Sequence, residues 1–161
     1  YLAGREHTRI GLLLDGSPEG TISQQRRRAG FLHAVRKFRC ENDPALIQNG
    51  ISETWLEEIG RIIRAGATAL ISCGEGSGLR VDFALNLFRK KVPSELSVIS
   101  FENGSSRFCT PPHTTLSQDF ARIASESLDL LETLLHDPAQ GVSRQIPYRL
   151  VVRESVAGRE S

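Results

Sequence analysis

Residues 98–103 read Val98-Ile99-Ser100-Phe101-Glu102-Asn103, and residues 110–120 read Thr110-Pro111-Pro112-His113-Thr114-Thr115-Leu116-Ser117-Gln118-Asp119-Phe120. The first stretch is a short apolar run that ends in a polar turn, as expected of a strand buried in a parallel sheet. The second is a proline-stiffened crossover that leads into an amphipathic helix. Because open α/β sheets bind small molecules at the carboxyl ends of their strands, this junction predicts both the fold and the place of a ligand site.

The rest of the chain repeats this order of apolar strand, polar turn and amphipathic helix. Strands are expected over residues 8–15, 45–48, 69–73, 97–101 and 145–153, and helices over about 21–38, 52–66, 78–91 and 119–136. The β-α-β-α-β-α-β order predicts the α/β class, with a doubly wound parallel sheet.

Composition limits the possible functions. The 161 residues are 39% hydrophobic and carry a formal net charge of +1, which is typical of a soluble globular domain. The one local basic cluster is 26–28, so no overall basic field is available to hold nucleic acid. No apolar run reaches the roughly 20 residues that a membrane span needs, and no signal-peptide pattern is visible.

The first residue is Tyr1 and the chain contains no Met, so we expect an excised segment of a longer protein. Cys40, Cys73 and Cys109 have no C-x-x-C spacing, which argues against a disulfide framework or a zinc site and favours the reducing cytoplasm. No nucleophile elbow and no H-x-x-x-H pair is present. We therefore expect no catalytic residues, no metal and no cofactor.

Six segments, in order along the chain, resemble the lactose/galactose-repressor (LacI/GalR) family of transcription regulators. They are residues 2–11 (L-A-G-R-E-H-T-R-I-G), 27–31 (R-R-A-G-F), 69–81, 92–101 (V-P-S-E-L-S-V-I-S-F), 110–120 and 150–155 (L-V-V-R-E-S). The resemblance implies a periplasmic-binding-protein-like (type I) lobe, specifically the C-terminal half of the effector-binding sensor. Within 1–161 it implies a far lobe at about 8–105 plus 146–157, and a crossover with a helix of the second lobe at about 110–140. The DNA-binding domain and the first part of the sensor are then absent from this chain.

The resemblance also implies effector-binding residues. Arg27 would point from its helix into the cleft, where the guanidinium fork suits vicinal hydroxyls or a carboxylate. Glu102 stands where the family's G-F-D-D motif has its first Asp, and would accept hydrogen bonds from sugar hydroxyls. Gln118 would hydrogen-bond the ligand or the hinge, and Phe120 would stack on a sugar face. Phe120 also belongs to the apolar stripe of its helix, so core packing is the alternative role.

Three further positions adjoin this set. Thr21 and Ser23 can add hydroxyl contacts, although capping of the following helix suits them better. Gly74 replaces an Asn that is often a ligand contact in the family. This departure predicts an altered or lost sugar effector.

Together these features predict the sensing and dimerising part of a cytoplasmic repressor that is not an enzyme. A sugar-like small molecule would bind between two lobes and alter the affinity for operator DNA, which a separate N-terminal domain would hold. Homodimer contacts would come from the helices beginning near Thr54 and Leu79. Without the first lobe, the stripe from Phe120 to Leu135 would leave an apolar patch exposed.

Two alternatives belong to other functional classes. A periplasmic sugar-binding protein for transport shares the expected fold. An S-adenosylmethionine-dependent methyltransferase would use the turn Gly74-Glu75-Gly76-Ser77-Gly78 after strand 69–73. Glu102 would then hold the ribose hydroxyls.

Overall fold

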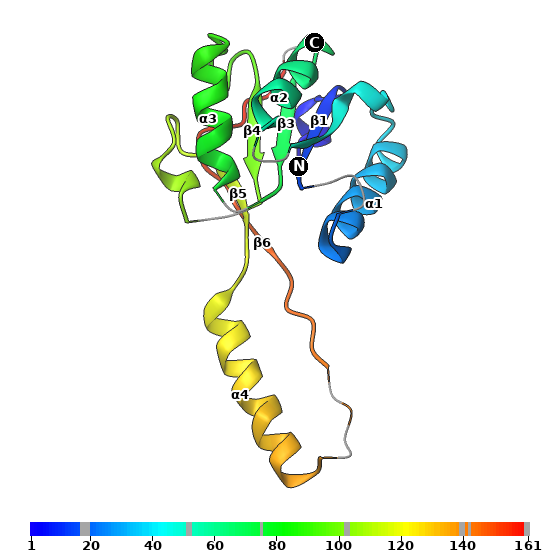
Figure 1. Cartoon of the computed structure of the whole chain (residues 1–161), viewed down its shortest axis with the longest axis vertical. Coiled ribbons are helices and arrows are strands. Elements are labelled where there is room, and N and C mark those ends of the chain that lie inside the picture. The colour runs from blue at the N-terminus through cyan, green and yellow to red at the C-terminus, as the bar shows by residue number, and fades with distance from the viewer. Residues whose placement is uncertain are drawn as a thin grey trace.

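The computed structural model describes residues 1–16, 20–50, 53–74, 76–101, 104–138, 141 and 143–159. The strands are β1 Ile10–Asp15, β2 Ile47–Gly50, β3 Ala69–Ser72, β4 Ser97–Ser100, β5 Thr114–Ser117 and β6 Arg149–Val151. The helices are α1 Ile22–Lys37, α2 Trp55–Arg64, α3 Ser77–Leu87 and α4 Phe120–His136, with short 3-10 turns η1 Ala3–Arg5, η2 Pro44–Leu46 and η3 Ser106–Phe108. Figure 1 shows a lobe built on these strands and a long arm that leaves the lobe at one end.

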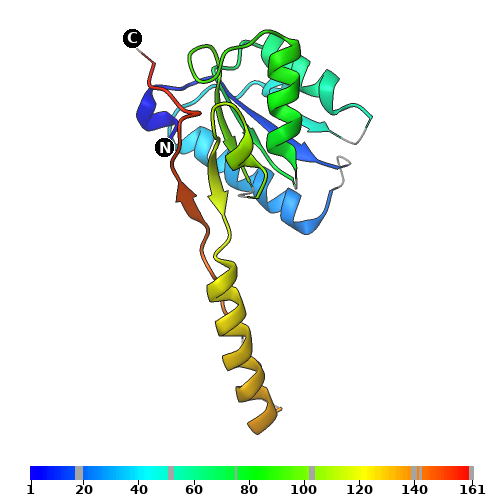
Figure 2. The same cartoon turned by 90° about the vertical axis from the view of Figure 1, so that its left-hand side faces the viewer.

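The sheet has the strand order β2-β1-β3-β4-β5-β6. The first five strands in this order are all parallel to one another, and β6 pairs antiparallel with β5. Helix α1 covers one face, and α2 and α3 cover the other (Figure 2). The predicted doubly wound α/β sheet is therefore confirmed.

Strand β1 explains why both faces carry helices. Leu13 points into the core under α2 and α3, whereas Leu12 and Leu14 pack on the opposite face with Phe31 of α1. A strand buried on both faces needs a continuous apolar run instead of alternation. Gly11 is required in this run, since a Cβ there would lie 2.4 Å from Cγ2 of Ile62.

The C-terminal segment ties the lobe together next to β4 and β5. The buried Ser155 hydroxyl accepts a hydrogen bond from the Thr114 amide at 2.7 Å and donates one to the Val98 carbonyl at 2.6 Å. The Val98 amide in turn donates to the Ser155 carbonyl at 2.8 Å. Residues distant in sequence are thereby held by polar groups that would cost free energy if left unpaired.

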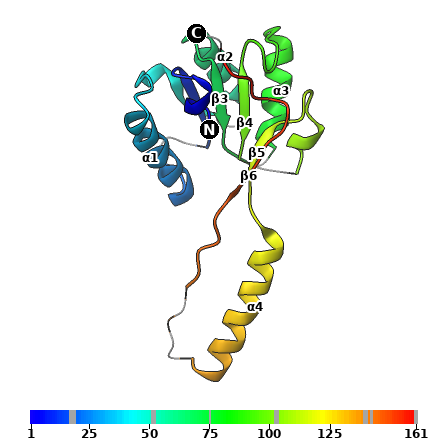
Figure 3. The ribbon, with the colours of Figure 1, turned by 180° about the vertical axis from the view of Figure 1, so that it is seen from behind.

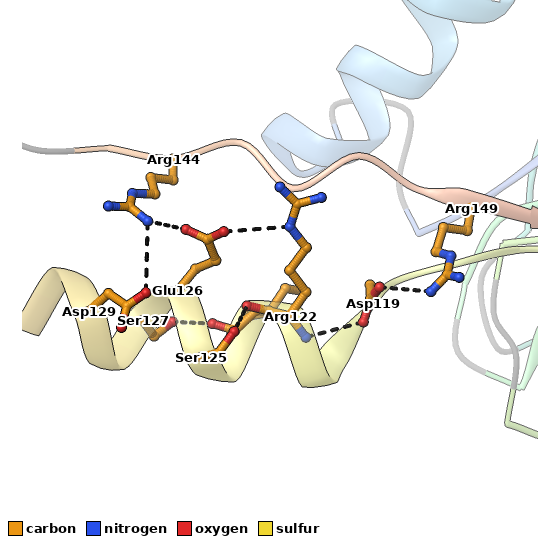
Figure 4. A network of polar contacts seen from close by, with 9 residues as sticks. Asp119, Arg122, Ser125, Glu126, Ser127, Asp129, Arg144 and Arg149 are labelled. Atoms are coloured by element: carbon orange, nitrogen blue, oxygen red, sulfur yellow. Dashed lines mark hydrogen bonds and ion pairs between the residues drawn. The ribbon is translucent and has the colours of Figure 1, made fainter.

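Helix α4 stands clear of the lobe in views from both sides (Figures 1 and 3). None of its residues is buried. Figure 4 shows the ion pairs that link it to the returning segment. The Arg144 guanidinium contacts Glu126, and Arg149 Nη1 lies 2.9 Å from Asp119 Oδ2, whereas the pair of Arg122 with Glu126 lies within α4 itself. Among its described residues, the arm thus has ion pairs towards the returning segment and no buried apolar side chain.

Strand β5 corrects the prediction of a plain crossover at residues 114–117. Thr114 and Thr115 are fully buried and pair with β4. Threonine is β-branched and suits a strand, but its hydroxyl made this stretch resemble a loop in the sequence.

Several predicted boundaries were also wrong. The strand expected at 45–48 begins at Ile47, because Pro44 starts a 3-10 turn whose Ala45 amide donates to Asp43 at 2.9 Å. Helix α3 ends at Leu87 instead of near 91, and Arg89 then adopts a left-handed conformation. The final strand is shorter than 145–153. Gly66 terminates α2 with a φ of +77°, as expected of a helix-ending glycine.

His7 gives the lobe a pH-dependent stability. The ring is buried, with Nε2 3.0 Å from the Ala157 carbonyl and Nδ1 2.9 Å from Thr68 Oγ1. Burial lowers the pKa of His7 below its usual 6.5; the hydrogen bond to the Ala157 carbonyl opposes this in part, and the charges of Arg159 and Arg5 add to the lowering. The folded state therefore favours the neutral His7 ring. In the unfolded chain the same ring has a higher pKa and binds a proton more readily.

We predict that the free energy of unfolding is highest above about pH 7 and declines as the pH falls through 6.5 towards the folded pKa. In His7→Gln, urea unfolding between pH 5 and 7.5 should show a shallower pH dependence than in the unsubstituted chain. His33→Gln, on the exposed side of α1, should keep the original slope. Equal slopes in His7→Gln and the unsubstituted chain would contradict this role.

Candidate functional site

A cavity of about 490 Å³ opens at the carboxyl ends of the parallel strands, where the lobe meets the arm. Its wall consists of Asp15, Gln24, Arg27, Gly74, Phe101, Gly104, Leu116, Gln118, Phe120 and Tyr148. The size lies within the range of small-molecule pockets. Aromatic faces, hydrogen-bond donors and one carboxylate converge there from β1, α1, β5 and α4, from the segments that follow β3 and β4, and from the returning segment.

Arg27 reaches the cavity from the second turn of α1. The helix start is set by Thr21, whose side chain accepts a hydrogen bond from the Gln24 amide at 3.4 Å. The Arg27 guanidinium lies 4.8 Å from the centre of the Phe101 ring. This cation–π contact orients a cation with several donors beside an aromatic surface.

Gln118 and Tyr148 bridge the two chain segments that form the arm. Gln118 Nε2 donates to the Tyr148 hydroxyl at 3.2 Å. The Tyr148 ring meets Phe101 edge to face, with ring centres 5.7 Å apart. Movement of the arm would therefore change the wall of the cavity.

Asp15 takes the space beside Gly74. A Cβ on Gly74 would lie 2.7 Å from Asp15 Cβ and Oδ2, and the φ of +141° also favours glycine. The family's Asn does not fit here while Asp15 keeps this position. The Asp15 carboxylate lies 3.9 Å from Arg80, and both groups are too exposed for this ion pair to contribute much. The Asp15 carboxylate is therefore available as a hydrogen-bond acceptor at the cavity wall.

Phe120 begins α4 and is 69% exposed, so the described residues of this chain form no core around it, and its packing against another lobe stays a prediction. Its helix is capped by Asp119, which accepts from the Arg122 amide at 3.1 Å. This hydrogen bond, followed by that of Arg149, lowers the pKa of Asp119. An ionised carboxylate thus stabilises the helix start that carries Phe120 into the cavity wall.

The structure brings together four residues singled out from the sequence: Arg27, Gly74, Gln118 and Phe120. Thr21 and Ser23 hydrogen-bond each other at 2.8 Å at the start of α1 and do not belong to the described cavity wall. Glu102 lies outside the described residues. The binding roles of all seven residues stay predictions.

Sequence reasoning missed four polar or aromatic members of the wall: Asp15, Gln24, Phe101 and Tyr148. Asp15 had a usable signal, since it is the polar last residue of an apolar strand whose carboxyl end lies at the predicted ligand edge. Gln24 lies three residues before Arg27, on the same helix face. Tyr148 had no local signal, because the antiparallel return of the chain determines its position.

Two other features do not compete as chemical sites. A hollow of about 250 Å³ between α1 and the sheet is lined by apolar groups such as Phe31, Val35 and Phe38, and lacks the convergent polar groups of the first cavity. Burial raises the pKa of Cys73 to about 12, so this thiol stays protonated at neutral pH and is a poor nucleophile.

Comparison with known proteins places these observations in a family. The model of the periplasmic binding protein-like domain matches residues 1–156. The chain is 32% identical to the HTH-type transcriptional repressor PurR of Mannheimia succiniciproducens, over 97% of this chain and 49% of the repressor. The chain thus spans about half the length of this relative.

Two solved structures share the fold. One is a LacI-family sugar-binding transcriptional regulator from Escherichia coli in complex with phosphate, with a TM-score of 0.82, 20% identity, and coverage of 98% of this chain and 58% of the regulator. The other is a dimeric Lac repressor, with a TM-score of 0.83, 23% identity, and coverage of 98% and 59%.

In the part of the chain that the structure describes, no helix is long and apolar enough to cross a membrane. The relatives are repressors, which favours a regulator over the methyltransferase that the glycine-rich turn alone suggested. The order of motifs, the parallel sheet and the match over residues 1–156 agree, and the chain belongs to the periplasmic binding protein-like domain family, while its similarity to PurR agrees with the LacI/GalR resemblance of the sequence.

Proposed function

We propose that the chain is the effector-sensing part of a LacI-type transcriptional repressor and that it binds a small hydroxylated molecule in the cavity at the strand ends. The cavity itself supports this most strongly. Arg27, Gln24 and Gln118 offer donors, Asp15 offers an acceptor, and Phe101, Phe120 and Tyr148 offer ring faces. This combination suits a sugar-like ligand, whose hydroxyls need both donors and acceptors and whose ring faces are apolar.

A second lobe completes the proposal. Helix α4 presents a stripe of apolar residues at helical spacing that is exposed in this chain: Phe120, Leu128, Leu131 and Leu135. A continuous stripe of large exposed apolar side chains typically marks an interaction surface. We assign residues 8–105 and 146–157 to one lobe and 110–140 to a crossover with a helix of the other lobe, which would cover this stripe and close the cavity.

This arrangement suggests how a ligand acts. A molecule that touches Arg27 in one lobe and Gln118 or Phe120 at the start of the arm favours one orientation of the arm over others. Unequal affinity for two orientations shifts their populations, with a coupling of about 1–3 kcal/mol in typical cases. A separate N-terminal helix-turn-helix domain would convert this shift into a change in affinity for operator DNA in the cytoplasm. No catalytic step is required.

A screen by thermal unfolding tests the ligand class, using sugars, sugar phosphates, nucleosides and S-adenosylmethionine. A ligand that binds the folded chain raises its melting temperature. We predict a rise with one class of sugar or sugar-like ligand, and at least about 10-fold weaker binding in Arg27→Ala because charge-assisted hydrogen bonds are lost.

Arg28→Ala is the matched control for the ligand screen, since Arg28 is the exposed neighbour of Arg27 on α1. It should bind the ligand as the unsubstituted chain does. A response to S-adenosylmethionine alone, or equal losses in both variants, would contradict the proposal.

We also propose that α2 and α3 form the homodimer surface. Leu79, Phe83 and Leu87 are 48%, 59% and 57% exposed at successive helical turns of α3, and Phe108 of η3 is 70% exposed. Trp55 of α2 meets Phe83 with ring centres 6.1 Å apart. The fold is shared with a dimeric Lac repressor. In a two-fold dimer each copy contributes the same surface, so the apolar surface of α3 and η3 on one copy would be covered by the same surface on the other.

We predict that Phe83→Glu weakens self-association at least about 10-fold in sedimentation experiments, because it places a charge in an apolar contact. Leu131→Glu on α4 is the control, with the same change of chemistry on the other apolar stripe. It should leave the dimer intact. Dissociation by Leu131→Glu but not by Phe83→Glu would show that the arm, and not α3, forms the dimer.

A further inference from the structure

Three side chains with metal-ligating atoms converge away from the cavity. They are Asp82 of α3, Cys109 directly after η3, and His113 directly before β5. Their ligand atoms all lie within 4.8 Å of one another. The three residues come from separate segments, so this convergence depends on the tertiary fold.

The three groups differ in their access to water. Cys109 is 3% exposed and His113 is fully buried, whereas Asp82 is half-buried at the outer side. Buried thiol and imidazole groups with a partly open carboxylate give a site with a dry interior and one open side. That pattern suits an ion held by three protein ligands and a water molecule.

Surrounding hydrogen bonds hold the three groups in place. His113 Nδ1 lies 3.1 Å from the Ser100 hydroxyl, so Nε2 would be the nitrogen that binds the ion. The Thr110 amide approaches Asp82 Oδ1 at 3.4 Å, and Arg153 Nη1 donates to the His113 carbonyl at 2.6 Å. Histidine ligands typically have their second ring nitrogen engaged in this way.

We propose that Asp82, Cys109 and His113 form a binding site for a zinc ion. Thiolate, imidazole and carboxylate are the three ligand types of protein zinc sites. One thiolate and one carboxylate balance the two positive charges, so the loaded site is neutral. Cys109 would release its proton to solvent as the zinc–sulfur bond forms.

The geometry requires only a small adjustment. Ligand atoms of a tetrahedral zinc site lie about 3.5 Å apart, and the ligand atoms here all lie within 4.8 Å of one another, so no pair needs to close by more than roughly 1.3 Å. The bound ion would fasten α3 to the segment that begins β5, and thereby steady the base of the arm.

Cobalt(II) is a direct probe, because a cobalt–thiolate bond gives a charge-transfer absorption that oxygen and nitrogen ligands do not. The chain, purified with chelator and then dialysed free of it, should bind one equivalent of cobalt with this absorption, and zinc should displace it. Zinc at 100 times its Kd should raise the melting temperature by about 5 °C or more.

Matched variants identify the ligands. Cys109→Ser should lose the absorption. Asp82→Asn keeps the size of the half-buried Asp82 side chain but removes its charge, and should weaken cobalt binding at least about 10-fold. Cys40→Ser should behave as the unsubstituted chain does. The proposal is overturned by absence of the charge-transfer band, by its persistence in Cys109→Ser, by its loss in Cys40→Ser, or by unchanged affinity in Asp82→Asn.

Discussion

Burial of the parallel sheet on both faces is the constraint on which the rest of this structure depends. Strand β1 sends Leu13 to one face and Leu12 and Leu14 to the other, so neither α1 nor the α2–α3 layer can be lost without exposing the strand. Each buried large apolar side chain contributes about 1.5–3 kcal/mol. A sheet built in this way must place the carboxyl ends of its strands at one edge, where Asp15, Gly74 and Phe101 meet.

The cavity at that edge lies between the lobe and the base of the arm, which are stabilised by different interactions. Arg27 and Phe101 belong to the lobe, which has its own core, while Phe120 and Tyr148 belong to the base of the arm. The arm is held by exposed ion pairs such as Arg149 with Asp119, which contribute little stability in water. The proposed ligand, in contact with both parts, would therefore act on the part with the weaker intrinsic support, as the proposed sensor role requires.

The parallel order of the lobe was predictable because continuous apolar runs identify strands buried on both faces. Strand β5 was not, since Thr114 and Thr115 are polar in sequence and buried only through long-range pairing. For the cavity, family resemblance identified Arg27 and Gln118, but Tyr148 depends on the antiparallel return of the chain. The cluster of Asp82, Cys109 and His113 has no signal in sequence spacing, because only the tertiary fold brings α3 next to the segment between η3 and β5.

The central claim is that the lobe is stabilised by its own apolar core, whereas the arm has no such core and needs a second lobe to cover the apolar stripe of α4. Amide hydrogen exchange, resolved by peptide, tests it most directly. The account predicts strong protection in β1, β3 and α2, whose side chains form the core, and exchange at least about 100-fold faster along α4, which has no buried residue. Protection of α4 equal to that of β3 would contradict the account.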